Sequence, residues 1–503
     1  MSGAPATASV AEDRTPATGG GLRPSVAATL MPGFVGTELP AWLADRLRAG
    51  LGGVCIFGQN IVSRTQLREL TDAIRAANPL AVIAIDEEGG DVTRLYYDRG
   101  SPYPGPAVLG RIDDTALTEE VGRTVAAELA AVGCTLNFAP DADVNSNPDN
   151  PVIGVRSFGG DPASVARHVG AWIRGHEGAG IAVSAKHFPG HGDTAQDSHL
   201  ALPVIDADLA TLRARELVPF RAAIAAGART IMTSHILIPQ VDADHPATHS
   251  RRILHGLLRE ELGFDGVIVS DALDMKGASG VHGIPEAAVR AIDAGCDLLC
   301  IGTENTDEQL ADIEARILDA VASGRLAADR IAEAAQRVRR LGADTNAAIG
   351  AAVPVGEPSF DLERIVGSFD LADRAGAWIS AEDGPFTVVR IDTVANIAVG
   401  VAPWGPFTGA SDDSPWATAL RLSAAEPTLP EIPGPVVVVG KDIHRYAFAC
   451  EAIDNLRRNR SDVLVIDMGW PSDDRAYADI ATFGASRLLG AAVLSLLDGR
   501  GRG

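Results

Sequence analysis

Fourteen consecutive residues at 186–199, KHFPGHGDTAQDSH, combine one lysine, three histidines and two aspartates. Nine of the eleven histidines in the chain fall between residues 168 and 255, so this segment lies in an unusually histidine-rich region. Imidazole and carboxylate groups can ligate a metal ion, activate a nucleophile or transfer protons. Each of these roles requires a different spacing, and the spacing can therefore be used to choose among them.

Metal coordination by this segment is disfavoured. His187 and His191 have the i, i+4 spacing of two zinc ligands on one helix. Pro189 and Gly190 lie between them and oppose a helix there, and the glutamate of the HExxH motif is absent. We therefore predict no metal site.

Proton transfer fits the far end of the segment better than a serine nucleophile does. Ser198 is adjacent to His199 rather than opposite it, and the chain contains no G-x-S-x-G turn. In an extended chain residues i and i+2 point the same way, so Asp197 can orient His199 and raise its pKa above about 6.5. A turn aspartate beside an incidental surface histidine is the alternative, and these residues alone leave both interpretations open.

Eight short apolar runs recur along the first part of the chain. They occupy residues 25–34, 52–58, 81–88, 135–144, 182–188, 230–238, 266–273 and 295–302. Runs that are apolar throughout predict strands buried on both faces of a parallel sheet. Amphipathic segments lie between them at 65–78, 115–133 and 208–227. The alternation predicts an α/β fold, a (β/α)₈ TIM-like barrel, with a doubly wound open sheet as the alternative.

Polar residues gather where these runs end. They are found at 86–88, 137–143, 186–187, 235 and 271. Loops are polar in most proteins, which would account for one or two such positions but not for five that are rich in Asp, Lys and His. A barrel places all five around one mouth, where barrel enzymes carry out their chemistry. The pattern therefore favours the barrel.

The length of the chain predicts more than one domain. We predict a flexible N-terminal tail at 1–24, a catalytic barrel at 25–345, a linker at 346–360 and a smaller α/β sandwich domain at 361–503. In the last domain, apolar runs at 396–404, 435–443 and 462–470 predict parallel strands, and 481–497 predicts a terminal helix. The tail lacks the apolar core of a secretory signal, so we expect a cytoplasmic protein.

The composition excludes several classes of partner. The net charge of −23 opposes non-specific binding to nucleic acid or to anionic membranes. No apolar run reaches the roughly 18 residues of a membrane helix. The five cysteines are scattered and odd in number, which predicts buried free thiols rather than a disulfide framework; they are Cys55, Cys134, Cys296, Cys300 and Cys450.

The motifs resemble those of family 3 glycoside hydrolases, in the β-N-acetylglucosaminidase branch. The signature is "KHFPGHG…DSH…LP", from Lys186 to Pro203. It is accompanied in family order by "GGVCIFGQNI" (52–61), "AIDEEGGDVTRL" (84–95), "NFAPDADV" (137–144), "IGVRSFGGDP" (153–162) and "IVSDALDMKG" (268–277). The resemblance covers residues 25–345, and the C-terminal part matches more weakly.

The resemblance implies roles for individual residues. Asp271 is similar to the family nucleophile, with Asp274 as a rival and a helix-capping aspartate as the structural alternative. His199 is similar to the acid–base and Asp197 to its partner, on a loop to which Gly190 and Gly192 would lend flexibility. Five residues align with those that hold the hydroxyls of the terminal sugar, although the arginines could be ordinary ion-pair residues: Asp86, Arg94, Arg156, Lys186 and His187. His235 aligns with a pocket histidine, and His191 has no assigned role.

The implied reaction is a two-step, retaining hydrolysis of terminal β-linked N-acetylglucosamine, with muropeptides or related glycans as substrates. It needs no metal or organic cofactor. Phosphorolysis on the same scaffold is one alternative, because a histidine repels phosphate less than a carboxylate does. A non-catalytic sugar-binding protein is another, and a β-glucoside specificity stays open. The sequence does not indicate the oligomeric state.

Overall fold

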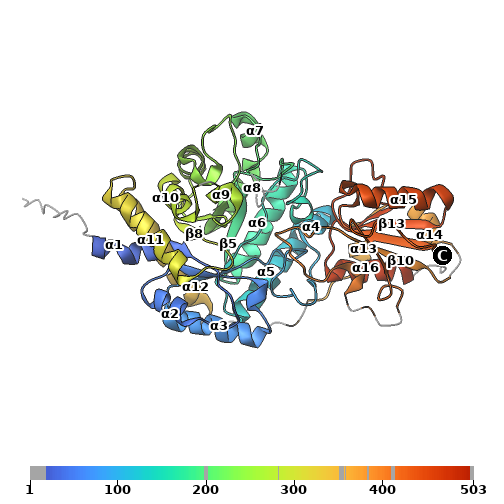
Figure 1. Cartoon of the computed structure of the whole chain (residues 1–503), viewed down its shortest axis with the longest axis horizontal. Helices are drawn as coiled ribbons and strands as arrows, with labels where there is room; N and C mark the ends of the chain where they lie inside the picture. Colours follow the sequence, from blue (N-terminus) through green and yellow to red (C-terminus); the bar gives the residue numbers. More distant parts are fainter. Residues whose placement is uncertain are drawn as a thin grey trace, which may run out of the picture.

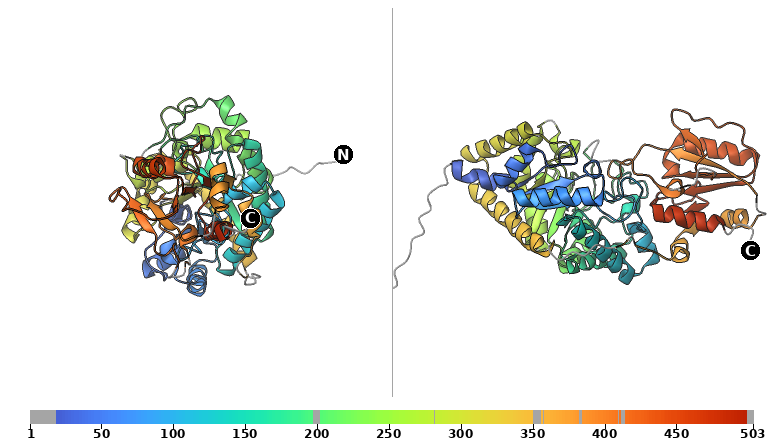
Figure 2. Two further views of the ribbon diagram at one scale, coloured as in Figure 1. Left: turned by 90° about the vertical axis from the view of Figure 1, so that its right-hand side faces the viewer. Right: turned by 90° about the horizontal axis from the view of Figure 1, so that it is seen from below.

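The computed structural model describes residues 19–196, 202–280, 282–349, 356, 358–381, 384–408, 410 and 414–498. Two sheets organise the chain, one of eight strands and one of six. Figure 1 shows helices arranged around the first sheet and a smaller layered unit beside it. The right-hand view in Figure 2 shows the two units following one another along the long axis.

The first sheet is a parallel barrel, as predicted. Its strands are β1 (Leu30–Met31), β2 (Gly53–Ile56), β3 (Val82–Ile85), β4 (Leu136–Asn137), β5 (Ala182–Phe188), β6 (Thr230–Thr233), β7 (Val267–Ser270) and β8 (Leu298–Cys300). They pair in the order β1-β8-β7-β6-β5-β4-β3-β2. The backbone N–H groups of Gly52 and Cys55 donate to the carbonyls of Ala27 and Pro32 and join β2 to the β1 segment. This sequential, nearly closed order excludes the doubly wound alternative.

Helices cover the outside of the barrel. They are α1 (Gly19–Ala27), α2 (Ala41–Arg48), α3 (Arg64–Ala77), α4 (Pro106–Ile112), α5 (Thr115–Ala131), α6 (Pro162–Gly178), α7 (Leu209–Ala214), α8 (Leu217–Ala225), a π-helix η4 (Arg252–Glu261), α9 (Lys276–Ser279), α10 (Ile284–Ala294), α11 (Asp307–Ala322) and α12 (Ala328–Ile349). Side chains of Ser63, Asp114 and Asp161 accept hydrogen bonds from the first-turn amides of α3, α5 and α6. These capping residues explain why the helices begin where they do.

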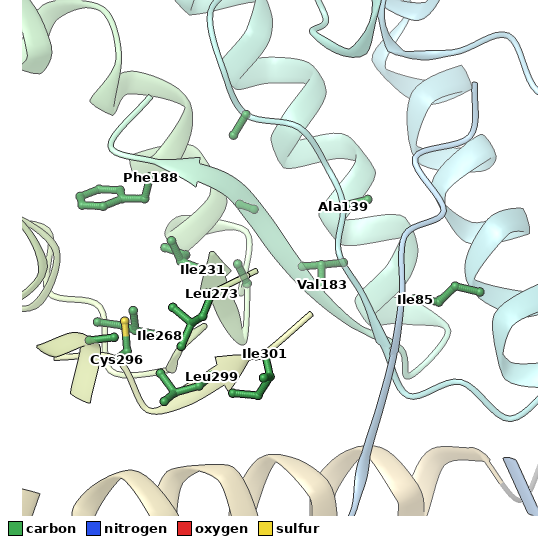
Figure 3. Packing of buried hydrophobic residues seen from close by; sticks show 14 of the residues in the cluster. Ile85, Ala139, Val183, Phe188, Ile231, Ile268, Leu273, Cys296, Leu299 and Ile301 are labelled. Atoms are coloured by element: carbon green, nitrogen blue, oxygen red, sulfur yellow. The ribbon is translucent and has the colours of Figure 1, made fainter. Parts of the chain in front are cut away.

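Each barrel strand is buried on both faces, which is why its sequence is apolar throughout. Val82 and Ala84 of β3 belong to a cluster inside the barrel, whereas Ile83 and Ile85 pack in the larger cluster between the sheet and the helices. Figure 3 shows side chains of the larger cluster, among them Ile231, Ile268 and Leu299 from three neighbouring strands. The two clusters hold the strand ends in a fixed arrangement.

The second unit is a mixed sheet flanked by helices. Its strands are β9 (Asp370–Leu371), β10 (Thr387–Asp392), β11 (Leu420–Ser423), β12 (Val436–Gly440), β13 (Val463–Asp467) and β14 (Ile480–Ala481), in the order β11-β10-β12-β13-β14-β9. Its helices are α13 (Leu362–Val366), α14 (Asp373–Ile379), α15 (Ala447–Asn459) and α16 (Arg487–Asp498). The pairs are parallel except β14 with β9.

Several expectations about element positions are wrong. Residues 25–27 end helix α1, which begins at Gly19 within the expected tail, and only Leu30–Met31 of that run form a strand. Residues 396–404 are not a strand, because the Asn396 side chain forms a turn and Gly400 has a φ of +76°. The strand that precedes them is β10, which the apolar runs did not reveal.

The two units are joined by specific contacts. Ala107 and Val108 of α4 pack in the apolar core of the second unit. The Arg111 side chain donates to the Ser368 carbonyl and pairs with Asp370. The smaller unit is therefore fixed against the barrel on the side of α4.

The structure also bears on the state of the cysteines and on the expectation that no helix spans a membrane. Cys55, Cys134, Cys296 and Cys300 are buried free thiols, as predicted, and Cys450 is a half-buried free thiol. Within the ranges that the structure describes, no helix combines the length and the apolar character that crossing a bilayer requires.

Candidate active site

A cavity of about 280 Å³ opens at the carboxyl ends of the barrel strands. Phe57, Phe138 and Cys300 line its apolar side, beyond β2, β4 and at the end of β8. Six of the residues expected in the site also line it: Asp86, Arg94, Arg156, Lys186, His187 and Asp271. The barrel thus brings together side chains that are up to 185 positions apart in the sequence.

Lys186 lies at the centre of a buried charge network. Its Nζ is 2.6 Å from Asp86 Oδ1 and 2.8 Å from Glu88 Oε1. Although burial opposes it, the two carboxylates raise the pKa of Lys186 above its ordinary value. The lysine is therefore a permanent cation at the end of β5 that can donate to a ligand hydroxyl.

Glu88 is held between two cations. Arg156 pairs with it in a bidentate manner, with Nη2 2.8 Å from Oε1 and Nε 3.0 Å from Oε2. Burial alone would raise the pKa of Glu88, but Arg156 and Lys186 hold it well below its usual range. The ionised carboxylate fixes both cations in place, and the sequence reasoning did not single it out.

Two aspartates and His187 form a second buried cluster. Asp143 Oδ2 lies 2.7 Å from His187 Nδ1, and Asp143 Oδ1 accepts from the backbone N–H groups of His187 and His191. Burial and the neighbouring Asp143 carboxylate raise the pKa of Asp141 well above its ordinary value. Asp143 orients the imidazole of His187.

This cluster has ligand atoms within 4.8 Å of one another, the spacing that a metal ion needs. Its groups also contact one another and a neighbouring cation. His187 Nδ1 already meets Asp143, and the Arg156 guanidinium lies 3.8 Å from Asp141 Oδ2. His187 and His191, whose spacing suggested helical zinc ligands, are instead packed edge to face with ring centroids 5.9 Å apart.

Gly190 and Gly192, expected to give flexibility to a loop, are buried and close-packed. A Cβ on Gly192 would lie 1.7 Å from the Val144 carbonyl oxygen, and one on Gly190 would lie 2.8 Å from the Glu216 side chain. The backbone between them is pinned by Asp143, which accepts from the His191 amide. These glycines therefore permit close packing of the chain in this conformation, and a flexible loop stays a prediction.

Asp271 and Asp274 both line the cavity, so the geometry admits either as an acidic residue of the site. Asp271 follows β7 directly, and its Oδ1 accepts from the Ala272 amide at 2.8 Å. Asp274 Oδ2 instead accepts from the Thr303 amide, on the loop after β8. Asp274 is thus engaged by the neighbouring loop.

The three remaining candidates are either placed differently from expectation or not described. His235 does not line the cavity; its Nε2 lies 3.0 Å from the carbonyl of Ala272, the residue after Asp271, and its Nδ1 meets Thr248. Asp197 and His199 lie outside the described residues. The structure therefore describes six of the nine expected site residues at the cavity, Asp271 among them.

His191, which had no expected role, lines the cavity. Its Nδ1 lies 3.0 Å from Thr194 Oγ1, and burial lowers its pKa to about 4. It is therefore a neutral imidazole at neutral pH. The sequence signature contains His191 but gave it no role, and Asp141 and Asp143 were recognised only as part of a polar run.

The barrel part of the chain is similar to a known protein family and to curated relatives. Residues 35–341 match the glycosyl hydrolase family 3 N-terminal domain. Beta-hexosaminidase of Stenotrophomonas maltophilia (strain R551-3) is 39% identical over 301 residues, covering 58% of this chain and 89% of the relative. Beta-hexosaminidase A of Pseudoalteromonas piscicida is 35% identical over 332 residues, covering 61% of this chain but only 55% of the relative.

A solved structure resembles the chain across both units. The family 3 β-N-acetylglucosaminidase of Paenibacillus sp. str. FPU-7 aligns with a TM-score of 0.80 and 30% identity, covering 95% of this chain and 97% of that one. The match therefore includes the barrel, its cavity and the second sheet. The chain belongs to glycosyl hydrolase family 3, in its β-N-acetylglucosaminidase (β-hexosaminidase) branch, and is a glycoside hydrolase.

Proposed function

We propose that the chain is a retaining, exo-acting β-N-acetylglucosaminidase that releases terminal β-linked N-acetylglucosamine from muropeptides or related glycans. The observation that carries the proposal is the juxtaposition, in one cavity, of the Asp271 carboxylate with the charged cluster around Lys186. The similarity to β-hexosaminidases supports the choice of sugar.

The charged cluster is suited to hold one sugar ring. Asp86 can accept from a hydroxyl, and Lys186 and Arg94, which lie 2.6 and 3.9 Å from its two oxygens, can donate to others. Charge-assisted hydrogen bonds of this kind are strong and directional. Since Glu88 holds Lys186 and Asp143 holds His187, these two side chains are already oriented before the sugar binds.

The proposed reaction has two steps. His199 protonates the glycosidic oxygen while Asp271 attacks the anomeric carbon, so the bond to the leaving group breaks and a bond to the carboxylate forms. His199 then removes a proton from water, which displaces Asp271 and restores the β configuration. Asp197 orients the imidazole throughout.

A chromogenic β-N-acetylglucosaminide tests the proposal directly. We expect turnover by the wild type, release of the β anomer as seen by proton NMR, and no turnover by Asp271→Ala. Asp274→Ala is the matched control, because it also removes a cavity carboxylate but not the proposed nucleophile. Equal loss in both variants, or release of the α anomer, would contradict the assignment of Asp271.

Two further substrates sharpen the test. The corresponding β-glucoside should be hydrolysed much more slowly if the N-acetyl group is recognised. Addition of inorganic phosphate should leave free sugar as the product, whereas formation of a sugar 1-phosphate would establish phosphorolysis in place of hydrolysis.

A further inference from the structure

A short segment of the second unit forms part of the cavity wall. Residues Asn396–Ala398, here called the wall segment, follow strand β10 of the smaller sheet. Ile397 and Ala398 line the same cavity as Asp86 and Asp271. The other described residues that line this cavity belong to the barrel. The cavity is thus lined both by the barrel and by a loop of the smaller unit, which lie far apart in the sequence.

The wall segment holds the end of the Arg94 side chain. Arg94 Nη2 donates to the Ala398 carbonyl at 2.9 Å, across 304 residues of sequence. The same nitrogen is 3.9 Å from Asp86 Oδ2. The backbone of Arg94 is fixed separately, because its amide donates to Glu87 at 2.9 Å. A guanidinium has five donors, so this bond sets its direction and leaves donors available for a ligand.

Asn396 clamps the wall segment onto the barrel. Its Nδ2 donates to the carbonyls of Pro151 and Val152, at 3.2 and 3.1 Å. Its Oδ1 accepts from the Ala398 amide at 2.9 Å and so shapes the turn that presents the Ala398 carbonyl. Val152 itself lines the cavity. One amide side chain therefore links the loop before Arg156 to the carbonyl that orients Arg94.

Tyr97 fixes the chain beyond the wall segment. Its hydroxyl accepts from the Val401 amide at 3.2 Å. A Cβ on Gly400 would lie 2.6 Å from the same hydroxyl, so only glycine fits there without displacement. The segment is held at both ends, and Ile397 nevertheless remains 49% exposed at the cavity.

We propose that the wall segment is a specificity-determining part of the sugar site. Asn396 and Ala398 position Arg94 for the hydroxyls of the terminal sugar, and Ile397 bounds the space that the sugar occupies. This inference rests on the proposed function and adds a role for the second unit. The Stenotrophomonas relative aligns over 89% of its length with only 301 residues, so it has little chain left for such a unit.

Ile397→Trp tests the wall directly, with Val394→Trp as the matched control. Val394 lies two residues before the segment, is 82% exposed and does not line the cavity. We expect Ile397→Trp to raise both KM for the chromogenic β-N-acetylglucosaminide and the inhibition constant of free N-acetylglucosamine about tenfold, with kcat within threefold of wild type. Val394→Trp should change these constants by less than twofold. Equal effects of the two substitutions would overturn the inference.

Asn396→Asp tests the positioning role. The carboxylate retains an acceptor for the Ala398 amide but cannot donate to Pro151 and Val152. We expect a rise in KM of about tenfold, the size that follows from losing one or two oriented hydrogen bonds, and no change in leaving-group dependence. An unchanged KM would show that the clamp only joins the two units.

A failure of the proposed hydrolysis can be distinguished from a failure of the wall-segment inference by measuring sugar binding directly. If the wild type does not hydrolyse the N-acetylglucosaminide, calorimetry with N-acetylglucosamine and with glucose measures the site without catalysis. Weaker binding of either sugar to Ile397→Trp, but not to Val394→Trp, would support the wall segment while the hydrolytic proposal falls. Absence of binding of both sugars to the wild type would overturn the inference as well.

Discussion

Arg156 and Glu88 form a buried bidentate ion pair at the barrel cavity, with nitrogen–oxygen distances of 2.8 and 3.0 Å. Lys186 shares the same carboxylate at 2.8 Å. The two cations come from different strand-end regions, on the loop after β4 and within β5. A single glutamate thus sets the position of two residues proposed to contact the substrate, and removing it should affect both stability and binding.

Glu88→Gln should lower the free energy of unfolding by about 3–5 kcal/mol, because it leaves two cations without their buried counter-charge. Urea denaturation followed by circular dichroism measures this loss. The control is Asp45→Asn, which breaks a surface pair between Asp45 and Arg48 whose side chains are 77% and 62% exposed. That change should cost about 0–1 kcal/mol. A loss in Glu88→Gln no larger than in the control would show that the network is not required for folding.

His199→Ala should slow hydrolysis most for substrates with poor leaving groups. Protonation of the glycosidic oxygen matters when the leaving alcohol is a weak acid and matters little for a nitrophenolate. The measurement is kcat/KM across a series of aryl β-N-acetylglucosaminides, plotted against the pKa of the leaving group. A steeper slope in the variant is the expected result; parallel lines for variant and wild type would remove His199 from the acid role.

Glu216→Gln should change how stability depends on pH. Burial raises the pKa of Glu216 to about 7, in spite of the adjacent Arg215, whereas an unfolded glutamate titrates near about 4.3. The folded chain therefore keeps a proton that the unfolded chain releases, so the stabilisation from Glu216 is complete below about pH 4.3 and is lost as pH rises through about 7.

The glutamine mimics the protonated side chain and does not titrate. The variant should therefore become more stable relative to the wild type as pH rises. We expect the difference in Tm between them to grow by a few degrees between pH 5 and pH 8. Differential scanning calorimetry of both proteins across this range gives the comparison. A difference that is constant with pH would mean that Glu216 is already ionised in the folded chain at pH 5.

Gly192→Ala should destabilise the chain by about 1–3 kcal/mol or more, because the added methyl would meet the Val144 carbonyl oxygen at 1.7 Å. Gly178 lies at the end of α6, and a Cβ added there would meet nothing within 4 Å. Gly178→Ala should therefore stabilise the folded chain by about 0.5–1 kcal/mol. Thermal unfolding of both variants tests the contrast. Similar Tm values would show that the backbone near Gly192 moves easily, as a hinge would.

Local sequence pattern was sufficient for most of the barrel. Runs such as 81–88 and 266–273 are apolar throughout because strands β3 and β7 are buried on both faces. The pattern also located Asp86 and Asp271 directly after these strands, which is where a parallel barrel opens. Strand burial and the residue that directly follows a strand are both visible in a short stretch of sequence.

The same reasoning failed where burial depends on distant contacts. Residues 396–404 are as apolar as a strand but lie against the barrel as a loop, with Ile397 exposed at the cavity. Strand β10 is buried at only some positions, so its sequence lacks a continuous apolar run.

The sequence by itself determined the family, the barrel and several of the residues that line its cavity, because these follow from motifs and from periodic burial. Only the tertiary structure decided that Glu88 pairs with Arg156, that Gly190 and Gly192 are close-packed, and that the Ala398 carbonyl holds Arg94. Such contacts join residues 68 and 304 positions apart. These contacts form only because the packing of helices and strands brings distant strand ends and loops together. A short stretch of sequence carries no information about such packing.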